Sequence, residues 1–96
     1  MKKRAEIIKL LRMHKAALQS KYKVGSLALF GSYARGDQKP GSDVDLLVEV
    51  DPSIGLKFVS LAEEIENLIG IHVDLVSTRA VKPAKMKFIK PELIHV

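Results

Sequence analysis

The sequence predicts a single small domain of the α/β (α+β) class over residues 1–96, with a mixed β-sheet of about four strands flanked by helices. A chain of 96 residues is long enough for one hydrophobic core and too short for a second domain. Hydrophobic residues make up 47% of the chain and charged residues 28%, as in ordinary globular domains. Short β-forming runs alternate with segments of helical periodicity, and this alternation indicates the fold class.

The first two predicted elements are a helix and a strand. Apolar side chains at Ile7, Leu11 and Leu18 share one stripe of residues 2–20, and this spacing predicts an amphipathic helix whose charged residues face water. Residues 24–30 follow as the first strand. Their last four residues, Leu-Ala-Leu-Phe, form a short apolar run that is typical of a buried strand.

A tight turn follows the first strand. Residues 32–35 are predicted to form one or two helical turns that end at Gly36. Gly31 and Ser32 therefore lie at a strand-to-helix turn, where free backbone N–H groups can face an anion. A turn or loop at residues 39–42 leads to the next strand.

Two further strands are joined by the clearest helix of the sequence. Residues 43–50 are predicted as the second strand, which ends before Pro52 because proline cannot donate to a ladder. Residues 58–69 keep one apolar face at helical spacing, and Gly70 can end the helix in a left-handed conformation. Residues 71–76 form the third strand. Because a helical crossover leads to it, we expect it to run parallel to a neighbouring strand.

The C-terminal segment is predicted to add a short helix and an edge strand. The helix covers residues 83–89, begins with a proline and carries Met86 and Ile89 inward, and the strand covers residues 93–96. We interpret the lysines of residues 82–90 as a solvated face, with docking of a partner as the alternative.

Three aspartates are placed to converge on one side of the sheet. Asp43 and Asp45 are two apart on the second strand, so both point to one face, ~6.6 Å apart along the backbone, while Val44 points to the opposite, buried face. Asp74 alternates with apolar residues in the third strand. Pairing of the two strands would bring the three acids together, where they repel one another without cations.

Converging carboxylates suit phosphoryl chemistry. Hard cations such as Mg²⁺ prefer carboxylate oxygens, and two such ions ~3.5–4 Å apart can polarise the attacking and leaving oxygens of a nucleotidyl transfer. We predict that Asp43 and Asp45 bridge two Mg²⁺ ions. Asp74 is predicted to bind the ion that activates the acceptor hydroxyl, or to accept the proton of that hydroxyl.

The glycine-serine turn supplies the contacts to the triphosphate in this prediction. Gly31 lets the backbone approach the phosphates, and Ser32 offers a hydroxyl and an N–H group. Arg35 either adds positive charge to the phosphates or pairs with a nearby acid. Tyr33 either touches the base or ribose or packs inside the domain.

The run Gly-Ser-Tyr-Ala-Arg-Gly at residues 31–36, the run Ser-Asp-Val-Asp-Leu at residues 42–46 and the acid Asp74 together resemble the polymerase-β-like nucleotidyltransferase superfamily. The length of the chain and the form of these runs resemble the minimal nucleotidyltransferases, the MntA-like antitoxins of HEPN toxin–antitoxin systems. The resemblance covers nearly the whole chain. This resemblance implies Mg²⁺-dependent transfer of AMP from ATP to a tyrosine hydroxyl of a HEPN toxin, and a hetero-oligomer with that toxin. The positions that match the functional residues of this group are Gly31, Ser32, Asp43, Asp45 and Asp74.

Composition excludes or disfavours several other classes of protein. The chain has no cysteine, which rules out a disulfide framework or thiolate metal site and fits a reducing cytoplasm. No apolar run approaches the roughly 18 residues of a membrane span. The net charge of +5 suits nucleotides, nucleic acid or an acidic protein surface. Aromatic residues are only 5% of the chain, without the interleaved pattern of single-strand binders, which argues against nucleic acid as the direct substrate.

Two alternatives to AMP transfer onto a toxin stay open at the level of the sequence. The first is a non-catalytic antitoxin that neutralises its partner by docking alone. The second is nucleotidyl transfer to RNA or to a small molecule.

Overall fold

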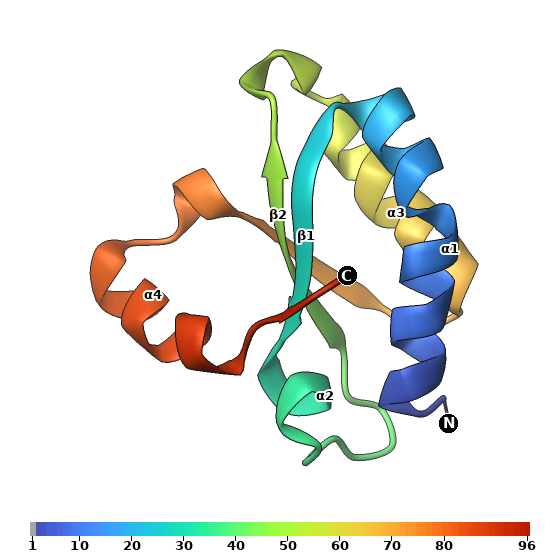
Figure 1. The fold of residues 1–96 in the computed structure, drawn as a ribbon, viewed down its shortest axis with the longest axis vertical. Helices are drawn as coiled ribbons and strands as arrows, with labels where there is room; N and C mark the ends of the chain where they lie inside the picture. The colour runs from blue at the N-terminus through green and yellow to red at the C-terminus, as the bar shows by residue number, and fades with distance from the viewer. Residues whose placement is uncertain (1) are drawn as a thin grey trace.

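A four-stranded mixed sheet forms the centre of the structure, with the strand order β3-β2-β1-β4 (Figure 1). The computed structural model describes residues 2–96. Strand β1 (Val24–Phe30) pairs antiparallel with β2 (Val44–Val50) and with β4 (Ile94–His95). Strand β2 pairs parallel with β3 (Val73–Ser77). The predicted α/β class, the mixed sheet and the parallel third strand are confirmed.

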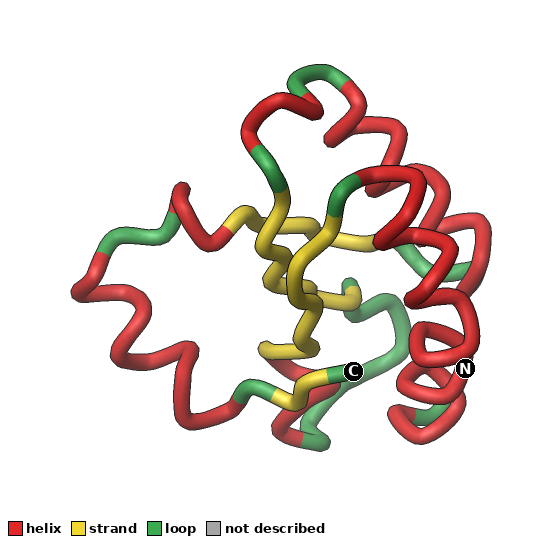
Figure 2. Tube along the Cα trace, turned by 45° about the horizontal axis from the view of Figure 1, so that its top comes forward, coloured by secondary structure: helices red, strands yellow, loops and turns green. Residues whose placement is uncertain are grey.

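Helices lie on both sides of the sheet. Helices α1 (Arg4–Tyr22) and α3 (Lys57–Ile69) lie side by side against one face, and α4 (Pro83–Ile89) lies on the other side (Figures 1 and 2). The short helix α2 (Gly31–Arg35) follows β1 directly. Among residues 2–96, no helix combines the length and the apolar character that crossing a membrane requires. Residues 2–96 also contain three 3₁₀ turns: η1 (Pro52–Ile54), η2 (Thr78–Ala80) and η3 (Lys90–Glu92).

The main core lies between the sheet and helices α1 and α3. Alternate residues of β2, beginning with the fully buried Val44, face these helices. Because side chains alternate along a strand, Asp45 is left on the opposite face, together with the acidic Glu49. Packing of one face thus determines which face carries the acids. The fully buried core residues of these elements are Ile7, Leu11, Leu18, Leu29, Val44, Leu46, Val48, Leu61, Ile65 and Ile69.

The observed boundaries differ from the predicted ones where two strands begin. The sequence predicts Asp43 as the first residue of the second strand, but Asp43 precedes β2, and His72 likewise precedes β3. The ladder between the two strands begins at Val44, whose N–H donates to the carbonyl of His72 at 2.9 Å. Just before it, the Lys39 N–H donates to Ser42 Oγ at 2.9 Å and closes a turn. This turn holds Asp43 outside the strand.

Candidate functional site

Two aspartates of adjacent strands, Asp45 and Asp74, form an acidic row on the face of the sheet opposite the core. Asp45 of β2 and Asp74 of β3 are partners in the parallel register, and Phe30 of β1 is the antiparallel partner of Asp45. Partners in adjacent strands point to the same face. Phe30, Asp45 and Asp74 therefore stand side by side across three strands. The predicted strand pairing is present, while the catalytic roles of the acids stay a prediction.

Asp43 lies at the edge of this row. Its side chain is 54% exposed, and its Oδ1 atom is 3.3 Å from Nδ1 of His72. The other ring nitrogen of His72, Nε2, is 3.5 Å from Oε1 of Glu66 on α3. His72 therefore borders the acids through Asp43.

The glycine-serine turn lies directly against Asp45. Gly31 is buried and has a φ of +74°, in the left-handed region that favours glycine. A Cβ atom at this position would collide with the carboxylate of Asp45. Glycine is therefore required here both by the backbone conformation and by the close approach to the acid.

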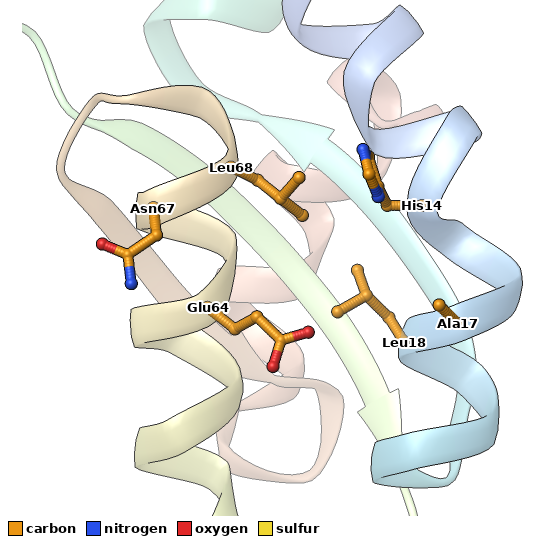
Figure 3. A pocket seen from close by; sticks show the side chains of 6 residues that line it. All are labelled: His14, Ala17, Leu18, Glu64, Asn67 and Leu68. Carbon is orange, nitrogen blue, oxygen red and sulfur yellow. The ribbon is translucent and has the colours of Figure 1, made fainter.

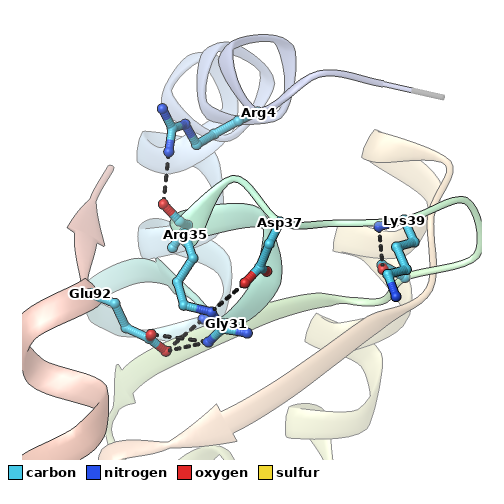
Figure 4. A network of polar contacts seen from close by, with 8 residues as sticks. Arg4, Gly31, Arg35, Asp37, Lys39 and Glu92 are labelled. Atoms are coloured by element: carbon cyan, nitrogen blue, oxygen red, sulfur yellow. Dashed lines mark hydrogen bonds and ion pairs between the residues drawn. The ribbon is translucent and has the colours of Figure 1, made fainter.

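A glutamate from the C-terminal segment holds this turn (Figure 4). The Gly31 N–H donates to Oε1 of Glu92 at 3.0 Å. Arg35 donates from Nη1 to Oε2 of Glu92 at 3.0 Å and from Nε to Oδ2 of Asp37 at 3.1 Å. Of the two possibilities for Arg35, the structure shows pairing with acids. Arg4 secures the far end of α2, because its Nη1 atom donates to the carbonyl of Ala34 at 2.7 Å.

Glu92 carries no clear signal in the sequence as a site residue, and the structure decides between the two possibilities for Tyr33. Glu92 is 61 residues from Gly31, and its one distinguishing feature in the sequence is that no other acid follows Arg79. Its side chain is only 19% exposed, so its interactions with the turn are partly shielded from water. Tyr33 is 1% exposed and belongs to the core cluster, so it packs inside the domain.

The acids make the region around Asp45 electrostatically strained. Burial raises the pKa of the Asp45 carboxyl above its ordinary value, and the neighbouring carboxylates of Asp74 and Asp43 raise it further. Glu92 acts in the same direction, and Arg35 opposes it. A cation placed among these carboxylates would relieve this repulsion.

The donor set fits Mg²⁺ that is shared with a substrate. Within residues 2–96, no three or more histidine, cysteine, aspartate or glutamate side chains are arranged to hold a metal ion by themselves. Mg²⁺ is usually held by one or two carboxylates together with water and substrate phosphates, not by a complete protein cage. Asp43, Asp45 and Asp74 are the residues that would hold it, and all their ligand atoms are the carboxylate oxygens that Mg²⁺ prefers.

Two cavities lie on opposite sides of the sheet, and one of them is lined by an acid of the row. One of about 330 Å³ lies between α1 and α3 and is lined by side chains such as His14 and Glu64 (Figure 3). These helices cover the core face, so the sheet separates this hollow from the acidic row. The other, of about 500 Å³, is lined by Asp74, Phe30 and residues of α4, on the side of the acids.

A buried glycine turn packed against an aspartate, which pairs in turn with a second aspartate, is the arrangement that the sequence predicts for transfer of a nucleotidyl group. Residues 11–95 match the model of the family described as nucleotidyltransferase domain. The chain belongs to this family and is a nucleotidyltransferase.

Similar proteins include relatives of about the same length and a solved structure with the same fold. A Methanocaldococcus jannaschii protein with the provisional name protein adenylyltransferase is 45% identical over 101 residues, which cover 100% of both chains. The protein adenylyltransferase MntA of Thermococcus cleftensis is 41% identical over 93 residues, or 95% of this chain and 93% of that one. A crystal structure of a toxin–antitoxin with AMP-PNP matches with a TM-score of 0.66 and 27% identity, over 96% of this chain and 70% of that one.

Removal of the Glu92 carboxylate should weaken both the turn and the activity. We expect Glu92→Ala to lower the free energy of unfolding by ~1–3 kcal/mol, because the buried Gly31 N–H loses its acceptor. Nucleotidyl transfer should fall with it. Urea denaturation and an activity assay measure the two effects, and Glu63→Ala on the exposed side of α3 is the control. Equal behaviour of the two variants would contradict the role of Glu92.

Proposed function

We propose that this protein is an antitoxin that transfers AMP from ATP to a tyrosine hydroxyl of a HEPN toxin, in a reaction that requires Mg²⁺. The observation that carries the proposal is the in-register pair Asp45 and Asp74 beside the buried Gly31. The adenylyltransferase names of the relatives support AMP as the transferred group. The similar toxin–antitoxin structure with AMP-PNP supports a toxin as the partner and ATP as the donor.

Each residue of the site has a role in this proposal. Asp43, Asp45 and Asp74 would hold Mg²⁺, which when bound would neutralise phosphate charge and activate the acceptor. Ser32 contacts the triphosphate through its N–H group and its hydroxyl. Gly31, whose own N–H donates to Glu92, lets the backbone approach the phosphates. Arg35 acts through its contact with Glu92, which fixes the Gly31-Ser32 turn.

The transfer itself is a single displacement at phosphorus. The tyrosine oxygen forms a bond to the α-phosphorus of ATP, and the bond from this phosphorus to the bridging oxygen breaks. Pyrophosphate leaves with the electron pair of that bond. Asp74 accepts the proton of the phenol, so the atoms and charges balance.

Incubation with ATP labelled at the α-phosphate tests the proposal. The protein is mixed with Mg²⁺ and a cognate HEPN toxin, and the products are separated and analysed by mass spectrometry. We expect label on the toxin, AMP on a tyrosine, and loss of the signal when EDTA removes the metal. Label on RNA or a small molecule alone, or no label with both proteins folded, would overturn the proposal.

The double variant Asp43→Ala/Asp45→Ala separates chemistry from docking. If transfer neutralises the toxin, cells that express the toxin with this variant should die, although the variant remains folded. Survival of these cells would favour the alternative, in which the antitoxin acts by binding alone.

A further inference from the structure

The cavity beside Asp74 lies over the acidic row. It has a volume of about 500 Å³ and lies between the sheet and the segment formed by η2 and α4. Phe30 and Asp74, which flank Asp45 in the register, both line it. Of the three acids, Asp74 is the one that lines the cavity. The space is therefore open to the acid that we assign to the acceptor hydroxyl.

The walls of the cavity are apolar and its mouth is basic. Lys82 and Lys85 are exposed and contribute positive charge where the cavity meets solvent. A chamber with an aromatic and aliphatic lining and one carboxylate suits a ligand that is an apolar ring with one hydroxyl group. The apolar residues of the lining are Phe30, Val76, Ala80, Val81, Ala84 and Ile89.

We propose that this cavity binds the acceptor tyrosine of the partner protein, an inference that rests on the proposed function. The tyrosine ring packs among the apolar walls, and its hydroxyl lies at Asp74, which accepts the proton. Lys82 and Lys85 attract acidic groups that flank the tyrosine in the partner. The specificity for a tyrosine acceptor thus comes from α4 and η2, outside the glycine turn and the Asp43-Asp45 pair.

The same lining is poorly suited to the adenine base. Adenine carries several hydrogen-bonding groups on its edge, which lose free energy when they are buried without partners. Apart from Asp74 and the two lysines, the side chains that line the cavity are apolar. In addition, the Gly31-Ser32 turn, where we place the triphosphate, does not line it.

Filling the cavity tests the inference. Ala84 is exposed on α4 and lines the cavity, so Ala84→Phe should occupy the space without disturbing the core. We expect AMP transfer to the toxin to fall by about tenfold or more, as a raised KM for the toxin. The Kd for AMP-PNP with Mg²⁺, measured by calorimetry, should change less than about twofold. Ala16→Phe on the exposed side of α1 is the control for the size of the new side chain.

Charge reversal tests the basic mouth. Lys82→Glu/Lys85→Glu should raise the KM for the toxin, again with unchanged AMP-PNP binding. The matched control is Lys87→Glu/Lys90→Glu, which makes the same change at two lysines that line a different hollow. Equal effects of the two pairs would show that net charge, and not this cavity, determines recognition of the toxin.

Three further outcomes would overturn the inference. In the first, Ala84→Phe weakens AMP-PNP binding as much as it weakens transfer, which would mean that the cavity holds the nucleotide. The second is unchanged transfer by Ala84→Phe. The third comes from titration with N-acetyl-tyrosine amide, followed by NMR, in which the methyl signals of Val81 and Ala84 do not shift. This titration needs no turnover, so it tests the cavity even if the protein transfers no AMP.

Discussion

Replacement of Asp45 by asparagine should abolish transfer and at the same time stabilise the metal-free protein. Activity should fall by about 10³-fold, because one carboxylate that holds Mg²⁺ is lost. The melting temperature at neutral pH should rise by about 4 °C, which corresponds to ~1 kcal/mol in a domain of this size after allowance for screening by water. The variant keeps the shape of the side chain and removes its repulsion with Asp74 and Asp43.

The gain in stability should depend on pH. The pKa of Asp45 is raised in the folded protein, so the folded state binds this proton more tightly than the unfolded state does. The ionised carboxylate therefore lowers stability at pH values above its folded pKa. This penalty disappears as the pH falls through the folded pKa to below the unfolded one, and Asp45→Asn and the original protein should then melt together.

Thermal melts in EDTA between neutral and acidic pH measure this effect. Glu49→Gln is the control, because Glu49 lies on the same strand and face but is exposed and further from the row. A lower melting temperature of Asp45→Asn at neutral pH would show that the acids do not repel one another in the absence of metal.

Substitution of Gly31 by alanine should damage both fold and activity. The left-handed backbone costs a non-glycine residue ~1–2 kcal/mol, and the added methyl group must displace the Asp45 carboxylate, which adds ~1–3 kcal/mol. We expect the free energy of unfolding to fall by ~2–5 kcal/mol. Transfer should fall strongly as well, because the acid and the turn can no longer take up their positions together.

Gly36→Ala provides the matched control for this prediction. Gly36 has a φ of +85°, but a Cβ atom there meets nothing within 4 Å. It should therefore show the backbone cost of ~1–2 kcal/mol alone, with little loss of transfer. Urea denaturation gives both values. Similar values for the two variants would mean that the close approach of Gly31 to Asp45 has no energetic importance.

Elements with clear local signals could be predicted from the sequence. Strand β1 and helix α4 have the predicted bounds, and α3 ends where Gly70 takes a φ of +71°. Proline and glycine act through the backbone of their own neighbours, so their effect is visible in the sequence. The starts of β2 and β3 depend instead on where two distant segments first pair, and the prediction placed Asp43 inside a strand that begins one residue later.

The candidate site likewise has one part that could be predicted from the sequence and another that could not. The row of Asp45 and Asp74 follows from alternation along two strands, which the sequence displays. Glu92 could not be predicted, because its contact with Gly31 depends on how the C-terminal segment returns to the sheet. The cavity beside Asp74 could not be predicted either. Residues of α4 form part of its wall, and local sequence patterns do not show where this helix packs against the sheet.

The pairing of Asp45 with Asp74 also limits how the chain can change length. Strand β3 is an edge strand that is held to the sheet through β2, and its register places Asp74 opposite Asp45. Deletion of one residue between Gly70 and Val73 would turn the carboxylate of Asp74 toward the core and an aliphatic side chain toward solvent. This connection can therefore vary in its residue types during evolution, but hardly in its number of residues.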